Sequence, residues 1–557
     1  MAFDNLPRDL KEFRQYVRDY AETNIKPHSF RLDRDSEFPA EIVKDMQEKG
    51  FLSLIFDEEW GGAGLSQQHY SILSEEICRV DVGVGVIVGA HMSLGTWGIQ
   101  KWGTEEQKEK YLRPLLDGRS LGGFGLTEEN AGSDSAGTET TAEDMGDYYL
   151  LNGKKIYISN APIAQTYLIT AVTEPGIGNH GISMFIVDKD FEGFTFSEPY
   201  DKMGIRSSIT AELRFNNVKV PKENLLGELG KGFKQAMIIL DSGRIGVGAM
   251  GLGIAQGSFE SARAFTLQRE QFGRPIAAFQ NTQFMLADMA TKIHAGRLMI
   301  EDASKKKDNG EPYSKEAAMV KLYCTDLGQA VANDAVQLYG GAGFIKGTDV
   351  ERFYRDSKIT QIFEGTNQIQ RGIIASHILP KPEKREQTKE KKSIVGDRKK
   401  QIFKGQASEV ARQFVEALKN DGYTFDNKSE ADTNFEANDR VVVAGMGVGE
   451  EEKMELVHEL ARETGAAVGA TRPVSENKQF LPLDRYIGIS GQKYQGDLYI
   501  GLGVSGSAQH LSGIKDVKTI CVINNSENAP FFKNCDYGIV GDINEVVPAI
   551  IEEIKKA

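Results

Sequence analysis

The sequence predicts a multidomain protein in which two helical domains flank a small β-domain and a parallel α/β domain follows. The chain has 557 residues, more than one hydrophobic core usually supports. Apolar residues recur at helical spacing in some stretches and alternate in others, and this change of period distinguishes helices from strands. A densely charged stretch after residue 380 separates the last domain from the rest.

The first three domains are predicted from their periodicity. Residues 1–115 are helical in pattern, as in EIVKDMQEKGFLSLI and HYSILSEEICRV. Residues 118–228 contain YYLLNGKKIYIS, GISMFIVD and AELRFNNVKV, whose alternation predicts strands. Helical patterns return over residues 229–380, where SKEAAMVKLYCTDLGQAVANDAVQLYG is long enough for a bundle helix.

A linker and an α/β domain are expected after residue 380. Residues 381–437 are rich in charge of both signs, which predicts a linker, with a possible helix at SEVARQFVEALKN. Residues 438–557 contain short apolar runs such as VVVAGMG, DLYIGLGVSG and TICVIN, which alternate with helical patterns. This order is typical of a buried parallel sheet, whose ligands bind at the carboxyl ends of the strands.

Composition argues against several classes of protein. The net charge of −14 and the pI of about 5.3 disfavour a nucleic-acid partner. The N-terminus resembles no signal peptide and no run approaches about 20 apolar residues, so we expect a cytoplasmic protein without a membrane span. Cys78, Cys324, Cys521 and Cys535 lack metal-site or disulfide-framework spacing, which predicts buried free thiols and no metal site.

Three short stretches carry candidate chemistry. In GFGLTEENAGSDSAG, residues 122–136, glycines next to Thr127 and Ser133 form either a ligand-binding loop or a solvated turn. In KKIYISNA, Tyr157 and Ser159 share one strand face, which suits a planar heterocycle or an ordinary half-buried strand. In QIFEGTNQIQ, Glu364 is either a buried base or a solvated helix-capping residue.

Five stretches in order, GFGLTEENAGSD, KKIYISNA, REQFGRPIAAFQNTQF, QLYGGAGF and FEGTNQIQR, resemble the acyl-CoA dehydrogenase family, and most closely its short-chain, butyryl-CoA branch. The resemblance covers residues 1 to about 380. It implies the acyl-CoA dehydrogenase fold, with an α-helical domain, a β-barrel-like domain and a four-helix bundle, and it implies an FAD-containing homotetramer.

The resemblance also implies roles for individual residues. Glu364 matches the catalytic base that removes the α-proton, and Gly243 occupies the family's alternative base position. The positions that match FAD-binding residues are Phe124, Leu126, Thr127, Ser133, Tyr157, Ser159, Thr366 and Gln368, with Arg269, Phe272, Gln280, Gln337 and Gly341 reaching a neighbouring subunit's FAD. The positions that match substrate-binding residues are Ser133, Asp241, Arg244 and Gly365.

The segment VDVGVGVIVGAHMS limits the range of acyl groups that we expect the enzyme to accept. It corresponds to the family's pocket-lining helix. It contains no arginine to pair with a distal carboxylate, so a dicarboxylate would be poorly recognised. A short or otherwise apolar acyl chain is expected. Its length and branching stay open.

The C-terminal domain has a resemblance of its own. DLYIGLGVSGSAQHLSG, with GAAVGATR, YIGISGQ, CVINNSENAP and DYGIVGD, is similar to the FAD-binding domain of the electron-transfer flavoprotein α subunit over residues 439–557. The resemblance implies a second FAD, contacted by Thr471, Arg472, Ser490, Ser505, His510, Asn524 and Asp542. Met446 replaces an arginine and Ile489 a glutamine of that family.

Together these resemblances predict a flavoenzyme that oxidises a short-chain acyl-CoA to the 2-enoyl-CoA, or reduces the enoyl-CoA, with two FAD per chain. Electrons would leave to an electron-transfer flavoprotein or its β subunit, to another redox protein, or to dioxygen, as in an acyl-CoA oxidase. The alternative is a dehydrogenase whose C-terminal domain is a docking or nucleotide-binding module that carries AMP or no ligand.

Overall fold

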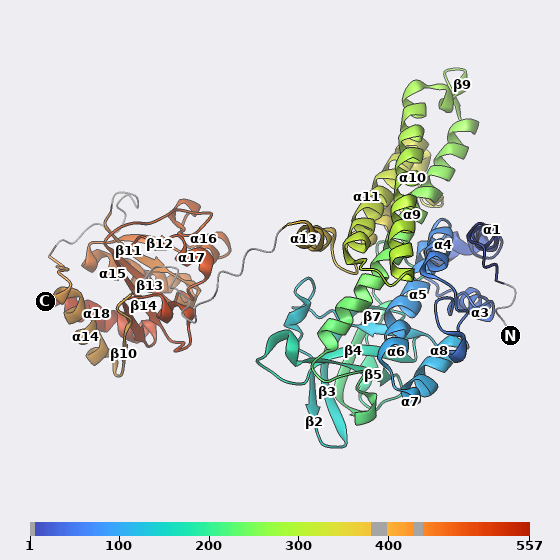
Figure 1. Cartoon of the computed structure of the whole chain (residues 1–557). Helices are drawn as coiled ribbons and strands as arrows, with labels where there is room; N and C mark the ends of the chain where they lie inside the picture. The colour runs from blue at the N-terminus through green and yellow to red at the C-terminus, as the bar shows by residue number, and fades with distance from the viewer. Residues whose placement is uncertain (1–5, 380–397, 427–437, 557) are drawn as a thin grey trace. The chain divides into compact units, whose positions relative to one another are not determined.

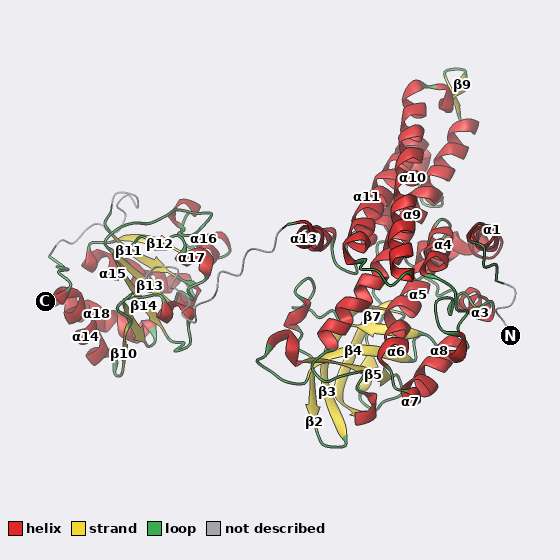
Figure 2. Cartoon of the chain, viewed as in Figure 1, coloured by secondary structure: helices red, strands yellow, loops and turns green. Residues whose placement is uncertain are grey.

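The computed structural model describes residues 6–379, 398–426 and 438–556 (Figure 1). The chain divides into two compact units, Met1–Lys381 and Pro382–Ala557. The first contains helices and a largely antiparallel sheet, and the second contains a parallel sheet with helices (Figure 2). Each unit has hydrophobic clusters of its own.

The first helical domain surrounds a buried helix. Its helices are α1 (Leu10–Tyr20), α2 (Lys26–Asp35), α3 (Ala40–Glu48), α4 (Gln67–Cys78), α5 (Val82–Gly89), α6 (Trp97–Trp102), α7 (Glu105–Gln107) and α8 (Arg113–Leu116). Every residue of α5 is buried. The π-helical turn η3 (Ala90–Thr96) follows it, and a Cβ at Gly95 would lie 2.5 Å from the carbonyl carbon of Gly122. This close approach joins the helical domain to the sheet.

The β-domain contains the three long strands that alternation predicted. Its strands are β1 (Gly122–Gly125), β2 (Thr141–Asp144), β3 (Tyr148–Ser159), β4 (Thr166–Val172), β5 (Ile182–Asp188), β6 (Phe194–Phe196) and β7 (Thr210–Pro221). They run in the order β1-β4-β2-β3-β7-β6, with β5 on β4. The start of the expected glycine loop is strand β1, parallel to β4. Cβ atoms at Gly123 and Gly125 would lie 2.7 and 2.6 Å from the side chains of Tyr167 and Ile169, so these glycines serve packing.

The third domain is the predicted helical bundle. It comprises α9 (Gly232–Gln268), α10 (Gln280–Asp308), α11 (Ser314–Tyr339), α12 (Asp349–Thr360) and α13 (Asn367–Ile378), with the short strands β8 (Glu270–Gln271) and β9 (Arg274–Pro275) between the first two. Figure 1 shows α9, α10 and α11 running side by side. A Cβ at Gly251 would lie 2.7 Å from the carbonyl oxygen of Cys324, so glycine lets α9 approach α11 closely.

Two helical stretches, Val82–Trp102 and Gly232–Gln268, are long and apolar enough by composition to cross a bilayer. These two stretches were not anticipated from the sequence, and the absence of a membrane span stays a prediction. Inside the molecule 89% and 78% of their apolar windows are buried, as is common for core helices. The expectation of buried free thiols is confirmed for all four cysteines.

The second unit is built on a six-stranded parallel sheet in the order β10-β15-β14-β13-β11-β12. The strands are β10 (Gln401–Lys404), β11 (Arg440–Ala444), β12 (Ala467–Ala470), β13 (Leu498–Leu502), β14 (Thr519–Asn524) and β15 (Tyr537–Val540). Helices α14 (Ala407–Asn420), α15 (Met454–Thr464) and α18 (Ile543–Lys555) pack on one face, and α17 (Ala508–Leu511) lies on the other. The short helix α16 (Arg472–Glu476) follows β12.

Part of the predicted linker belongs to this unit. Residues 398–426 contribute β10, which pairs with β15, and α14, which packs against α18. The helix predicted at SEVARQFVEALKN is therefore present, but as a layer of the domain. The remaining linker stretches, 380–397 and 427–437, lie outside the described residues.

A buried ion pair anchors the loop between β1 and β2, which carries Thr127 and Ser133. Lys155 Nζ donates to Glu128 Oε1 at 2.6 Å, and both side chains are buried. The Glu128 carboxylate also accepts the backbone N–H groups of Glu139 and Thr140. Burial lowers the pKa of Lys155 to about 8 although Glu128 opposes the shift.

We expect Lys155→Met to destabilise the first unit, because it leaves the Glu128 carboxylate buried without a counter-charge. Loss of one partner of a buried pair costs about 3–5 kcal/mol. Thermal unfolding followed by circular dichroism measures the change in Tm. The double variant Lys155→Met/Glu128→Gln removes both charges and should recover part of the loss; an unaltered Tm in the single variant would contradict the anchoring role.

Candidate functional site

Glu364 lies in the turn between α12 and α13, held in an uncommon backbone conformation. Its φ is +51° and that of Gly365 is +91°. Residues other than glycine, asparagine and aspartate rarely adopt this left-handed region. Thr366, rather than Glu364, caps α13, since its hydroxyl accepts the N–H of Ile369. The capping alternative for Glu364 is therefore excluded.

The carboxylate of Glu364 is directed toward α9. Its Oε2 is buried and has no hydrogen-bond partner in the described part of the chain. A Cβ built on Gly243 would overlap this oxygen. Glu364 and Gly243, the two positions that the family resemblance connected, therefore lie next to each other. Only glycine at position 243 leaves room for the carboxylate.

Two cations oppose the effect of burial on Glu364. Burial raises the pKa of Glu364 to about 7, while the charges of Arg244 and Lys321 lower it. Arg244 is paired with Asp241 on α9 and donates through Nε to the backbone oxygen of Glu364 at 3.3 Å. The buried Lys321 donates to Asn367 Oδ1 at 2.7 Å. The pKa of the carboxylate is therefore set by its burial and by charges on two neighbouring helices, α9 and α11.

The turn itself is fixed by side chains. Gln370 Nε2 donates to the carbonyl of Gly365 at 2.8 Å. A Cβ on Gly365 would lie 2.9 Å from this nitrogen. Glycine at 365 therefore keeps the turn close to α13. Gln368, in the first turn of α13, is exposed.

The candidate flavin residues of the β-domain lie at and after the end of β1 and at the end of β3. Phe124 and Leu126 are nearly buried, and the carbonyl of Thr127 accepts the N–H of Ile156 at 2.9 Å. Tyr157, with φ of +60°, is 65% exposed. Ser159 is half-buried and Ser133 is exposed. A rim of apolar side chains with one exposed aromatic ring can accept a planar group.

Another set of candidates lies away from Glu364, on the α9–α10 connection and around the end of α11. All of its members are exposed: Arg269, Phe272, Gln280, Gln337 and Gly341. Phe272 is 93% exposed with φ of +52°. Full exposure of an aromatic ring leaves it free to contact a partner or ligand.

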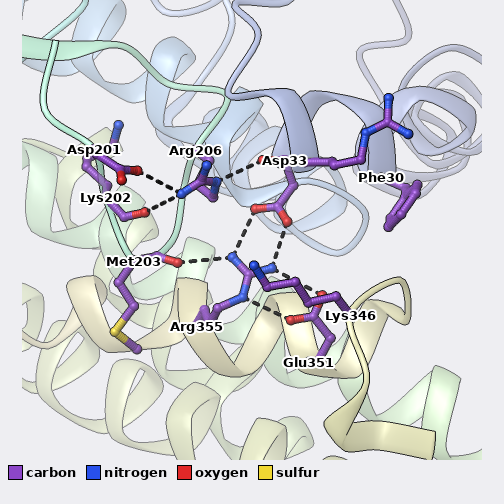
Figure 3. A pocket seen from close by; sticks show the side chains of 10 residues that line it. Phe30, Asp33, Asp201, Lys202, Met203, Arg206, Lys346, Glu351 and Arg355 are labelled. Atoms are coloured by element: carbon purple, nitrogen blue, oxygen red, sulfur yellow. Dashed lines mark hydrogen bonds and ion pairs between the residues drawn. The ribbon is translucent and has the colours of Figure 1, made fainter.

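A hollow of about 560 Å³ lies elsewhere in the first unit (Figure 3). Arg355 lies near its centre, paired with Asp33 at 2.7 Å and Glu351 at 2.9 Å. Arg206 pairs with Asp201 at 3.0 Å. None of the residues predicted from sequence lines this hollow. Its cations are largely neutralised, so it is a poorer candidate site than the Glu364 region.

In the second unit, glycine turns meet at the carboxyl end of the sheet. A Cβ on Gly503 would lie 2.6 Å from the Cα of Gly447, so the turns after β13 and β11 touch through their backbones. Thr471 directly follows β12 and Asn524 ends β14, two strands separated in the sheet by β13 and β11, and both residues are buried. Ser505, in the turn after β13, is exposed. Such a cradle suits a phosphate-bearing ligand, because it presents backbone N–H groups at short range.

Several candidate residues of this unit already have partners within the protein. His510 Nδ1 contacts the carbonyl of Ile487 at 3.0 Å and its Nε2 contacts the Tyr499 hydroxyl at 2.7 Å. The carbonyl can only accept, so Nδ1 carries the proton and Nε2 accepts from Tyr499. Burial lowers the pKa of His510 to about 4. Its ring therefore stays neutral near pH 7.

The other candidates divide between internal roles and the surface. Asp542 caps α18, Ser490 hydrogen-bonds Tyr486 and Arg472 pairs with Glu476. At the positions that depart from the family, Met446 is 48% and Ile489 64% exposed.

Sequence reasoning missed Lys321, a lysine within the apolar stretch EAAMVKLYC. The signal was available, because a lone lysine on the apolar face of a helix requires a partner if it is buried. It also missed Tyr70 on α4, whose hydroxyl is buried without a well-formed hydrogen bond among the residues described. A tyrosine in a helix carries no comparable signal.

Comparison with known proteins agrees with these observations. Residues 7–119, 123–218 and 230–379 match the N-terminal, middle and C-terminal domains of acyl-CoA dehydrogenase. Residues 434–515 match the electron transfer flavoprotein FAD-binding domain. Both matches identify families that bind FAD.

Similar curated proteins include the short-chain specific acyl-CoA dehydrogenase of Clostridium acetobutylicum, 45% identical over 375 residues, which are 67% of this chain and 99% of that protein. The 3-(aryl)acrylate reductase of Clostridium sporogenes is 44% identical over 366 residues, 66% of this chain and 97% of that protein.

Among solved structures, butyryl-CoA dehydrogenase from Megasphaera elsdenii is 42% identical with a TM-score of 0.66, covering 68% of this chain and 99% of that one. A chain in a structure described as an electron transferring flavoprotein of Acidaminococcus fermentans is 46% identical with a TM-score of 0.66, covering 68% of this chain and 100% of its own. The chain therefore belongs to the acyl-CoA dehydrogenase family, with a C-terminal electron transfer flavoprotein FAD-binding domain, and is a flavin-dependent oxidoreductase.

Proposed function

We propose that the enzyme catalyses α,β-dehydrogenation of short-chain acyl-CoA thioesters, with Glu364 as the base. One observation carries this proposal: the Glu364 carboxylate is buried against Gly243, and its Oε2 has no hydrogen-bond partner within the described ranges. Burial raises the pKa of this carboxyl group to about 7. A carboxylate with such a pKa and an oxygen free of hydrogen bonds is suited to proton transfer near neutral pH. The short-chain specific and butyryl-CoA names of similar proteins support the substrate class.

The protein's part in the reaction is to remove a proton and to stabilise charge. Glu364 takes the α-proton as the Cα–H bond breaks. Charge then develops on the thioester oxygen, and the backbone N–H of Glu364, which donates no hydrogen bond within the described residues, is available to it. An N–H group fixed by the Glu364–Gly365 turn acts as a preorganised oxyanion donor.

FAD is compatible with the residues that the family resemblance assigns to it, since they combine nearly buried apolar side chains with the exposed ring of Tyr157. Phe124, Leu126, Thr127, Tyr157 and Ser159 would hold the ring system, and Thr366 and Gln368 would lie near its phosphate and ribose. When bound, FAD supplies the acceptor for the β-hydrogen and its electron pair, so the α-proton and the β-hydrogen both leave and the double bond forms. Substrate would be held by Ser133, Asp241, Arg244 and Gly365.

We propose a homotetramer in the cytoplasm, without a nucleic-acid partner. Arg269, Phe272, Gln280, Gln337 and Gly341 would complete a neighbouring subunit's FAD site, and their exposure is compatible with that role. The opposite direction, enoyl-CoA reduction, is a second candidate function, since a similar protein is named a 3-(aryl)acrylate reductase.

The C-terminal unit would hold a second FAD at its glycine cradle, bringing the count to two per chain. Thr471, Arg472, Ser490, Ser505, His510, Asn524 and Asp542 are its candidate contacts. Tethering the two flavins on one chain gives an effective concentration of order millimolar. Electrons would then pass to an electron-transfer flavoprotein or its β subunit, another redox protein, or dioxygen. A docking module that carries AMP or no ligand is the competing proposal for this unit.

We expect Glu364→Gln to retain FAD and acyl-CoA binding but to lose at least 10³-fold in the rate of flavin bleaching by butyryl-CoA, because it removes the base and keeps its size. Anaerobic stopped-flow absorbance measures this rate. Asp356→Asn is the matched control, since burial also raises the pKa of Asp356 to about 7; this variant should bleach normally. Wild-type bleaching by Glu364→Gln would disprove the assignment.

The bleaching rate should rise with pH around pH 7, because the base must lose its proton. Lys321→Met removes a charge that lowers the pKa of Glu364, so the rise should move to higher pH. Burial lowers the pKa of Lys321 to about 7, whereas arginine stays charged throughout, so in Lys321→Arg the rise should lie at or below the wild-type pH. A profile that does not move in Lys321→Met, with FAD content intact, would rule out this electrostatic role.

The flavin count tests the second site. Gly503 has φ of +61° and no room for a Cβ against Gly447, so Gly503→Ala should reduce FAD from two per chain to one while butyryl-CoA still bleaches the remaining flavin. Gly449→Ala is the control, since Gly449 also has positive φ but open space around it. FAD released on denaturation gives the count. One FAD per wild-type chain would favour the docking module.

A further inference from the structure

Tyr70 on α4 lies close to the catalytic region but takes no part in the chemistry described above. Its side chain is almost completely buried. Its hydroxyl makes no well-formed hydrogen bond in the described structure. Burial raises the pKa of this hydroxyl, while Ser93 and Ser74 lie close enough to lower it by a smaller amount. A buried hydroxyl without a well-formed hydrogen bond is costly in a core that serves only packing. The position of this hydroxyl is therefore informative.

Glycines on two helices define where the hydroxyl lies. A Cβ on Gly246 of α9 would lie 2.7 Å from the Tyr70 hydroxyl oxygen, and a Cβ on Gly89 of α5 would lie 3.4 Å from it. The tip of the tyrosine therefore fills the gap between α5 and α9. The methyl group of Met250 lies against the same gap, 2.6 Å from the Cβ position of Gly89.

Tyr70 and Glu364 face the same side of α9. The Glu364 carboxylate lies over Gly243 and the Tyr70 hydroxyl lies over Gly246. Residues three apart lie on one helical face, so the two side chains are separated along α9 by about one turn, roughly 5 Å. The charge of Glu364 contributes to raising the pKa of Tyr70, after the larger effect of burial, as expected for neighbours.

We infer that Tyr70 is a specificity-determining residue, whose ring closes the acyl-chain end of the site between α5 and α9. The inference rests on the proposed function, since it takes Glu364 as the point at which the reacting carbons lie. About 5 Å from base to floor leaves space for only a few carbon atoms. Longer acyl chains would meet the phenol ring.

The ring and the hydroxyl make separate contributions. The ring determines the depth of the pocket, so removing it should admit longer chains. The hydroxyl makes the floor polar, and a terminal methyl group leaves it unpaired. Tyr70→Phe keeps the depth and should bind butyryl-CoA at least as well as the wild type does.

The test compares kcat/KM for butyryl-, hexanoyl- and octanoyl-CoA in the full-length holoenzyme. Tyr70→Ala should raise the octanoyl-to-butyryl ratio at least tenfold, because a pocket discriminates about 10–200-fold per methylene group. Tyr70→Leu, which keeps more of the core filled, should raise the hexanoyl-to-butyryl ratio and serves if the alanine variant does not fold. Tyr70→Phe should leave both ratios within about threefold of the wild-type values.

Ile72→Ala provides the matched control, because Ile72 is buried on the same helix two positions away and so points elsewhere. It should lose stability without a change in either ratio. Unchanged ratios in Tyr70→Ala or Tyr70→Leu, with full FAD content, would overturn the role of Tyr70 alone. Failure of every acyl-CoA to bleach the wild-type flavin would overturn the proposed function instead.

Discussion

The site depends on the burial of one carboxylate against helix α9, at a position where the helix has no side chain. Glu364 Oε2 can occupy its position only because residue 243 has no side chain. The protein gives its hydrogen bonds to the carbonyls of the turn, through Arg244 and Gln370. The Oε2 atom of the carboxylate receives none within the described residues. The hydrogen bonds to the backbone carbonyls therefore hold the turn in place, while the carboxylate oxygen stays free to accept a proton.

The same burial links the chemistry to stability. The pKa of Glu364 in the folded protein, about 7, lies above its value of 4.5 in an unfolded chain. Its contribution to stability is therefore fully present below pH 4.5 and is lost as pH rises through about 7. The proposed reaction requires Glu364 in its ionised form, which burial makes unfavourable. Lys321 and Arg244 limit the cost, because their charges favour the ionised form.

The sequence predicted the local features well and the distant contacts poorly. Period-2 alternation located β3, β5 and β7, and the ordered motifs singled out Glu364, whose Oε2 is buried over Gly243. Strand β10 was missed because its apolar part is only Ile402 and Phe403, between the polar Gln401 and Lys404. It becomes a strand by pairing with β15, over 130 residues away. The contact between Tyr70 and the face of α9 likewise joins helices that are far apart in sequence. No local pattern records such an approach.

The glycines nearest the two candidate sites make room for different groups. In the first, Gly243 and Gly246 make room for side chains with unused polar atoms, which can act on a substrate. In the second, Gly447 and Gly503 bring backbone against backbone, while His510 is engaged within the protein. Recognition there must rest chiefly on the shape and backbone N–H groups of the cradle. With His510 held neutral by burial, such a site can hold a ligand without an ionised imidazole beside it, which suits the electron-transfer role proposed for the C-terminal unit.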